Sequence, residues 1–176
     1  MIKTIIVPTD GSAHATKAVD LAADIASKYG ARLVLLHALL RDATPGQLRE
    51  LTEGTGVSKD ILDEFDRLEN MPIEAAAMAG MNAPVFVPAP PELLKKVGDL
   101  IGEKARKAAL AHGLDDVELC VVDGRPSDQI LELAAKESAD MIVMGNRGFG
   151  DLKGLLLGSV SHKVSHLSKC TCVTVK

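Results

Sequence analysis

Short runs of apolar residues recur along the chain, and segments with apolar and polar positions at helical spacing separate them. In the run from Leu33 to Leu36, every residue is apolar. Such continuous apolarity is typical of a strand buried on both faces, as in a parallel sheet covered by helices. The runs predict five strands, at residues 3–8, 32–40, 117–122, 140–144 and Thr171–Val175.

The segments between these strands predict helices, because their apolar residues return every three or four positions. Gly30 supplies a stop for the first helix, and either Asp10 or Ser12 can cap its start. The main helices are expected at residues 13–29, 91–112, 126–138 and 159–168. This alternation predicts an α/β fold, a doubly wound five-stranded parallel sheet with helices on both faces. The strand order 3-2-1-4-5 fits the chain best.

Residues 41–90 carry the weakest pattern, and we interpret them as a variable insert in a single domain that spans 1–176. Thr44 and Pro45 can start a short helix, and residues 58–68 fit another helix that Met71 and Pro72 would end. Residues 75–91 are rich in Ala, Met, Gly and Pro. We expect them to form an adaptable linker, lid or contact surface that covers another part of the protein.

The predicted topology brings two distant segments together at one edge of the sheet. In the order 3-2-1-4-5, the first and fourth strands are neighbours where the winding reverses, and such sheets bind ligands beyond the carboxyl ends of those strands. Asp10 follows the first strand, and Gly145 opens the loop after the fourth, about 130 positions later. A binding crevice is therefore expected between these two segments.

The loop after the fourth strand leads into a helix start and carries several glycines, at Gly145, Gly148, Gly150, Gly154 and Gly158. Glycine lets the main chain approach a ligand closely, and the unpaired N–H groups of a first helical turn attract anions. The loop therefore predicts a phosphate site, with the hydroxyls of Ser159 and Ser161 as further donors. Gly150 and Gly154 are expected to supply flexibility rather than contacts.

Composition narrows the classes of partner. Aromatic residues make up 2% of the 176 residues, whereas proteins that bind single-stranded nucleic acid use aromatic side chains for stacking. The formal net charge of -4 argues against DNA, RNA or an anionic membrane as the main partner. No apolar run reaches the roughly 18 residues that a membrane-spanning helix needs, and the first residues lack a secretory signal pattern. We expect a cytoplasmic protein whose cysteines, Cys120, Cys170 and Cys172, are reduced and buried.

Other catalytic and metal-binding patterns are missing or incomplete in the sequence. It contains no Gly-x4-Gly-Lys-Ser/Thr motif, which excludes a P-loop NTPase. His162 and His166 stand four residues apart on one predicted helix, but no third ligand or catalytic glutamate accompanies them. Ser159 and His162 lack the nucleophile elbow and the acidic partner of a catalytic triad. We therefore expect no catalytic residues and no metal held by protein side chains alone.

Four short motifs remain to be explained. The first three are Val7-Pro8-Thr9-Asp10-Gly11-Ser12, Leu36-His37-Ala38 and Val122-x-Gly124-x-Pro126. The fourth is the most specific, with Gly145-x2-Gly148, nine further residues and then Gly158-Ser159. Together they resemble the nucleotide-binding pattern of the universal stress protein family, in its ATP-binding branch. The resemblance covers nearly the whole chain except 41–90. It implies a Rossmann-like fold of the adenine nucleotide alpha-hydrolase type, with ATP and its Mg2+ as the ligand.

The resemblance also implies a role for each residue that matches the family pattern. The ribose and phosphate channel would be lined by Gly145, Arg147 and Gly148. Main-chain amides and hydroxyls would hold the phosphates at Gly158, Ser159, Val160 and Ser161. Ribose would contact Pro8, Thr9 and Asp10, and Asp10 would also reach the magnesium indirectly, through the phosphates. The adenine edge would meet the main chain of Ala38, with Met144 nearby. Without the resemblance, Asp10 could equally be only a helix cap, and Arg147 could be only a cation on the surface.

These features predict an ATP-binding regulatory protein of the stress response, whose nucleotide occupancy modulates conformation or assembly. Hydrolysis is expected to be slow or absent, because no residue is recognisable as a water activator and Arg147 alone resembles an arginine finger. A phosphotransfer or adenylate-forming enzyme on the same scaffold and a nucleotide-independent dimeric adaptor remain open as alternatives. The last strand, Thr171–Val175, is an apolar edge that tends to pair, and the resemblance implies a homodimer through it, with a higher oligomer left open.

Overall fold

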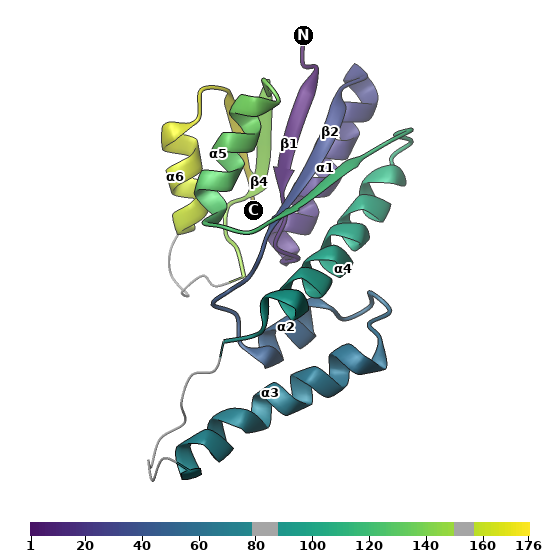
Figure 1. The fold of residues 1–176 in the computed structure, drawn as a ribbon. Helices are drawn as coiled ribbons and strands as arrows, with labels where there is room; N and C mark the ends of the chain where they lie inside the picture. Colours follow the sequence, from purple (N-terminus) through teal and green to yellow (C-terminus); the bar gives the residue numbers. More distant parts are fainter. Residues whose placement is uncertain (79–87, 150–156) are drawn as a thin grey trace. The chain divides into compact units, whose positions relative to one another are not determined.

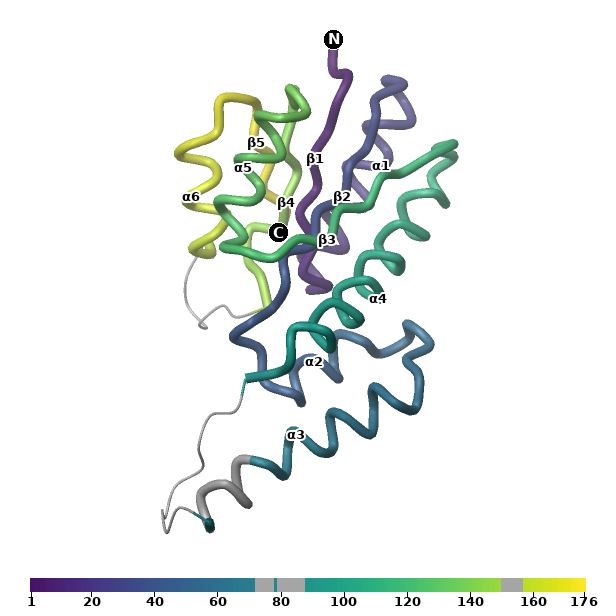
Figure 2. Tube along the Cα trace, in the orientation of Figure 1, coloured from purple at the N-terminus to yellow at the C-terminus, as the bar shows by residue number. Residues whose placement is uncertain are grey.

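The computed structural model of this protein describes residues 1–78, 88–149 and 157–176. Within these ranges the sheet has five parallel strands, β1 (Thr4–Pro8), β2 (Arg32–Ala38), β3 (Glu118–Val122), β4 (Met141–Gly145) and β5 (Thr171–Val175). Their order is β3-β2-β1-β4-β5, which confirms the predicted topology (Figure 2). β1 is the central strand, and its Ile5 stands opposite Leu33 of β2 and Met141 of β4.

The helices of the described residues are α1 (Ala13–Tyr29), α2 (Pro45–Leu51), α3 (Lys59–Met78), α4 (Pro91–Leu110), α5 (Pro126–Lys136) and α6 (Ser159–Leu167) (Figure 1). Ser12 is the N-cap of α1, because its Oγ accepts the N–H of Ala15 at 3.3 Å. At the other end, Gly30 takes a φ of 63°, the left-handed conformation that glycine adopts easily. Of the two candidate caps, the structure therefore selects Ser12 and leaves Asp10 for another role.

Alternate strand residues point to opposite faces of the sheet, and both faces are covered. On one face, Ile5, Leu33 and their neighbours pack with α1 and with the end of α4 around Ala109. On the other face, Ile6 and Ile142 pack with α5 and α6 (Figure 1). Burial on both faces explains why the inner strands β1, β2 and β4 contain continuous apolar runs in the sequence.

The chain divides into two compact units, one made of Met1–Leu39 with Ile101–Lys176 and the other of Leu40–Leu100, so that the division falls inside α4. The first unit holds the whole sheet and every residue that the sequence assigns to the site. The expectation of one domain with an insert at about 41–90 stays a prediction.

Within Leu40–Leu100, α2 and α3 are in contact, and Leu48, Phe65 and Leu68 are buried. The short helix expected at Thr44 and Pro45 is confirmed as α2. Its start is a capping box, in which Thr44 accepts the N–H of Gln47 and the side chain of Gln47 accepts the N–H of Thr44.

The prediction that Met71 and Pro72 end the next helix is wrong, because α3 continues to Met78. A proline inside a helix removes one main-chain hydrogen bond and costs about 3 kcal/mol, but it leaves the later turns able to form. Extending an existing helix also needs no new nucleus. The ends of the linker expected at 75–91 fall in α3 and α4, and its residues 79–87 lie outside the described residues.

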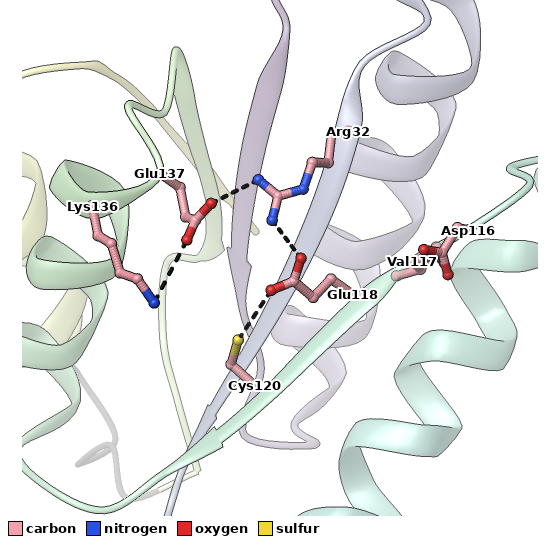
Figure 3. A network of polar contacts seen from close by, with 7 residues as sticks. All are labelled: Arg32, Asp116, Val117, Glu118, Cys120, Lys136 and Glu137. Carbon is pink, nitrogen blue, oxygen red and sulfur yellow. Dashed lines mark hydrogen bonds and ion pairs between the residues drawn. The ribbon is translucent and has the colours of Figure 1, made fainter.

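A polar network joins the amino ends of β2 and β3 to the end of α5 (Figure 3). The guanidinium of Arg32 contacts Glu118 and lies 2.7 Å from Glu137. The hydrogen bond between Arg32 and Glu137 lowers the pKa of Glu137, and the hydrogen bonds to both glutamates raise the pKa of Arg32. Lys136 extends the network to Glu137 at 3.9 Å. Burial, followed by the charge of Glu118, raises the pKa of the Cys120 thiol. This network lies at the strand ends opposite to those where the sequence predicts the site.

Asp140 fixes the start of β1 beside β4. Its Oδ2 accepts the N–H groups of Lys3 at 2.6 Å and Thr4 at 3.0 Å, and its own N–H donates to the carbonyl of Thr4 at 3.0 Å. The two accepted hydrogen bonds lower the pKa of Asp140.

Two further sequence expectations concern burial and membranes. The cysteines Cys120, Cys170 and Cys172 are free thiols, and each is half-buried rather than buried. No helix within the described ranges is long and apolar enough to span a membrane.

Candidate functional site

The chain that leaves β1 is held in place by β2. The N–H of Thr9 donates to the carbonyl of Leu36 at 2.9 Å, and the carbonyl oxygen of Thr9 lies 3.0 Å from Nδ1 of His37. Thr9 and His37 are both buried. Because a carbonyl oxygen can only accept, Nδ1 of His37 carries the proton of this contact. The main chain is therefore fixed immediately before Asp10.

Asp10 links the end of β1 to the loop that follows β4. Its Oδ1 accepts the N–H of Ser12 at 3.0 Å. Its Oδ2 accepts the N–H of Phe149 at 2.6 Å, across 139 positions of sequence. The two segments that the topology was expected to bring together do meet, and a charged side chain joins them.

Gly145 and Gly148 are required by close approach rather than by unusual backbone angles, since neither has a positive φ. A Cβ at residue 145 would lie 2.9 Å from the Cβ of His14 and 3.0 Å from the N of Ala15, in the first turn of α1. A Cβ at residue 148 would lie 2.6 Å from Oδ2 of Asp10. The loop after β4 is thus packed closely against α1 and Asp10.

The start of α6 is tied to the end of β4. Gly158 is its N-cap, and the N–H of Gly158 donates to the carbonyl of Asn146 at 2.8 Å. No side chain caps the helix, and the first intrahelical bond runs from the N–H of His162 to the carbonyl of Gly158. The N–H groups of the first turn, at Ser159, Val160 and Ser161, find no acceptor among the described residues. Such donors at a helix start suit an anion.

The two serines of this turn differ in what they offer. Ser159 is exposed, whereas Ser161 is buried. The hydroxyl of Ser161 lies 2.8 Å from the carbonyl oxygen of Asn146 and 2.9 Å from that of Gly158, and it donates to them. Its single proton is therefore engaged inside the protein, so that Ser161 offers a ligand its main-chain N–H rather than its hydroxyl.

The remaining residues assigned from the sequence lie at the carboxyl ends of the strands. Pro8 ends β1 and is half-buried, while Ala38 ends β2 and Met144 lies in β4, both buried with the cluster on the α5 and α6 face. Their side chains belong to the core, which leaves their main chain for any ligand. Arg147 is half-buried, and its Nε, although buried, meets no acceptor within the described ranges. It brings a positive charge to the loop between Gly145 and Gly148.

Comparison with known proteins identifies the family. The model of the universal stress protein family matches residues 1–176. The chain belongs to this family. It is 32% identical over 176 residues to universal stress protein YxiE of Bacillus subtilis, covering 100% of both chains. A universal stress protein of Thermus aquaticus, from the QAH/OAS sulfhydrylase 3' region, gives the same identity and coverage.

A solved universal stress protein in complex with cAMP has the same fold as this chain. The TM-score is 0.58 with 29% sequence identity, and the match covers 99% of this chain and 96% of that one. The family and the Rossmann-like fold expected from the four motifs are thereby confirmed.

Sequence reasoning missed Asn146, which lies inside the glycine pattern of this universal stress protein. Asn146 is buried, and its N–H donates to the carbonyl of Val175 at 2.7 Å. Its own carbonyl accepts from Gly158 and Ser161. The main-chain N–H and C=O of this one residue thus connect the end of β4 to the end of β5 and to the start of α6. No sequence signal distinguishes it, because the contacts are made by main-chain atoms that every residue has.

Side chains that could hold a metal by themselves are not grouped in the described part of this universal stress protein, where no cluster of three or more His, Cys, Asp or Glu occurs. The rings of His162 and His166 are stacked, with centroids 6.5 Å apart. The described part of the site offers main-chain N–H donors and the guanidinium of Arg147, which suit an anion. It also contains the carboxylate of Asp10, whose two oxygens accept N–H groups of the protein itself.

Proposed function

We propose that this universal stress protein binds an adenine nucleotide, ATP with Mg2+, between the end of β1, the loop after β4 and the start of α6. Occupancy of the site would modulate conformation or assembly in a stress response, with hydrolysis slow or absent. The observation that carries the proposal is the first turn of α6, whose N–H groups lack acceptors among the described residues, next to a loop that Asp10 fastens to β1.

The chemistry of the donor set supports a phosphate ligand. A phosphate accepts several N–H groups at once, and the partial positive charge of a helix start adds to the attraction. Arg147 adds a full positive charge on the adjacent loop. Magnesium would come bound to the triphosphate and neutralise part of its charge. The family pattern gives Asp10 only an indirect relation to this ion, through the phosphates. The cAMP complex of a relative 29% identical to this chain supports an adenine nucleotide.

A dimer through the edge strand β5 is part of the proposal. The N–H of Thr171 donates to the carbonyl of Asp140, and the carbonyl of Val175 accepts from Asn146, so these two residues pair toward β4. Because alternate residues of a parallel strand bond to the same neighbour, Cys172 and Thr174 direct their N–H and C=O groups outward. Outward N–H and C=O groups on an edge strand are a template for a second chain.

Calorimetric titration of the protein with ATP, in Mg2+ and separately in EDTA, tests the proposed function. We expect saturable binding of ATP, with AMP and cAMP as comparison ligands and GTP as the control for the base. Absence of binding at millimolar ATP with Mg2+ would overturn the proposal. An assay for released phosphate run on the same samples tests the regulatory part, which multiple turnovers would contradict.

A further inference from the structure

We infer that Asp10 is a positioning residue, whose carboxylate holds the beginning of the glycine loop against the end of β1. In this role it supports nucleotide binding through the main chain of Gly148 and Phe149, rather than through a magnesium ion. The effect on affinity rests on the proposed function, whereas the effect on the loop does not.

Both oxygens of Asp10 already accept N–H groups of the protein. Oδ1 faces the N–H of Ser12 at 3.0 Å, and Oδ2 faces the N–H of Phe149 at 2.6 Å. Ser12 is also the N-cap of α1. The carboxylate therefore connects the start of α1 to the loop after β4, and the contact to Phe149 is a short hydrogen bond to a charged acceptor.

Gly148 provides independent evidence that the loop is shaped around this carboxylate. Its φ is not positive, so its backbone conformation does not need glycine. The nearest atom to an added Cβ is Oδ2 of Asp10, at 2.6 Å, and the Asp10 Cγ follows at 3.8 Å. A residue with a side chain at position 148 would therefore collide with the oxygen that accepts the N–H of Phe149.

The presence of a carboxylate beside a proposed phosphate site also needs an explanation. A carboxylate repels phosphate, which makes it costly beside a phosphate site unless a cation or hydrogen-bond donors compensate it. Here the protein supplies one N–H donor to each oxygen. The geometry thus accounts for an aspartate at the switch point of the sheet without assigning it to a metal.

Amide hydrogen exchange of the ligand-free protein tests the inference directly. We expect the N–H of Phe149 to exchange at least about tenfold faster in Asp10→Ala, because a hydrogen bond to a charged group is lost. Asp24→Ala is the matched control, since Asp24 pairs with Lys28 on the exposed side of α1. Protection of β1 and β4 amides reports whether each variant is folded. An unchanged rate at Phe149 in a folded Asp10→Ala protein would overturn the inference.

Gly148→Ala provides a second variant, which keeps the carboxylate and disturbs its contact. We expect faster exchange at Phe149 in Gly148→Ala, and no additional acceleration when Gly148→Ala is combined with Asp10→Ala, because no oxygen is then left to collide with. Purely additive effects of the two substitutions would contradict a shared contact.

ATP titrations of Asp10→Ala separate positioning from metal binding. If Asp10 acts through the loop, affinity falls by a similar factor in Mg2+ and in EDTA. A loss confined to Mg2+ would make Asp10 a metal contact and refute the inference. If neither the unaltered protein nor the variant binds ATP, the proposed function fails, and the exchange rate of Phe149 alone decides the inference.

Discussion

Replacing Ser159 by proline removes one predicted phosphate donor while leaving the fold intact. Ser159 is the first residue of α6, and its N–H has no acceptor among the described residues. Proline is favoured at this helical position, where its missing N–H is not used by the helix. The preceding residue must be extended, and Gly158 already has φ -72° and ψ 158°. The protein itself starts α5 with Pro126 at the corresponding position.

The expected effect on binding follows from a single lost hydrogen bond. An N–H that donates to a charged acceptor contributes about 1.5–3 kcal/mol. Since about 1.4 kcal/mol corresponds to a factor of ten, the dissociation constant for ATP should rise by roughly 10- to 150-fold. The free energy of unfolding without ligand should change by less than about 0.5 kcal/mol, because no intramolecular bond is lost.

The assay compares Ser159→Pro with Ser159→Ala by calorimetry, with thermal unfolding as the measure of stability. Both variants lack the hydroxyl, and only the proline lacks the N–H, so their difference isolates the main-chain donor. If Ser159→Pro binds ATP as tightly as Ser159→Ala while both are folded, the start of α6 does not hold the phosphates and the reasoning is refuted.

Three further predictions concern stability, packing and assembly. Asp140→Asn keeps an acceptor for the N–H groups of Lys3 and Thr4 but loses the negative charge. Folding lowers the pKa of Asp140, so the charge stabilises the fold above the ordinary aspartate pKa of about 3.9. This stabilisation disappears as the pH falls through the lowered pKa of the folded protein. Thermal unfolding should therefore show Asp140→Asn less stable at pH 7, with a difference that shrinks as the pH falls below about 3.9, and a difference that stays constant in acid would contradict this assignment. Gly145→Ala should lower the free energy of unfolding in denaturant by about 1–3 kcal/mol, because the new Cβ would lie 2.9 Å from an atom of α1. In the control Gly46→Ala, the new Cβ would lie 3.4 Å from a flexible side chain and should be tolerated. Equal stabilities of the two variants would show that the close approach at Gly145 is unimportant. Thr174→Pro removes an outward N–H of β5, so size-exclusion chromatography should show a monomer, and a dimer that persists would place the interface elsewhere.

The sheet could be predicted from the sequence because its information is local and repeated. The inner strands are largely apolar runs, and the main helices between the strands have apolar residues at helical spacing. Few topologies then satisfy the rule of right-handed crossovers. The order β3-β2-β1-β4-β5 then places Asp10 beside the loop after β4 without any knowledge of individual contacts. The meeting of the two site segments is therefore a consequence of winding direction.

Features that depend on particular atoms could not be predicted. Proline usually ends a helix, but α3 continues past Pro72 to Met78. The hydroxyl of Ser161 is engaged by carbonyls that come close only after folding. The contacts of Asn146 with Val175 and Gly158 use its main-chain N–H and C=O, which every residue other than proline has. In each case the outcome depends on contacts that form only in the folded chain, and a pattern of residue types does not contain them.

The buried imidazole of His37 offers a natural spectroscopic probe of the site. Its Nδ1 faces the carbonyl of Thr9, the residue before Asp10, whereas the other four histidines of the chain are all at least partly exposed. Its ring nitrogens should therefore give nuclear magnetic resonance signals that differ from the other four. A shift of those signals on adding nucleotide would report, without any label or substitution, that the end of β1 responds to the ligand.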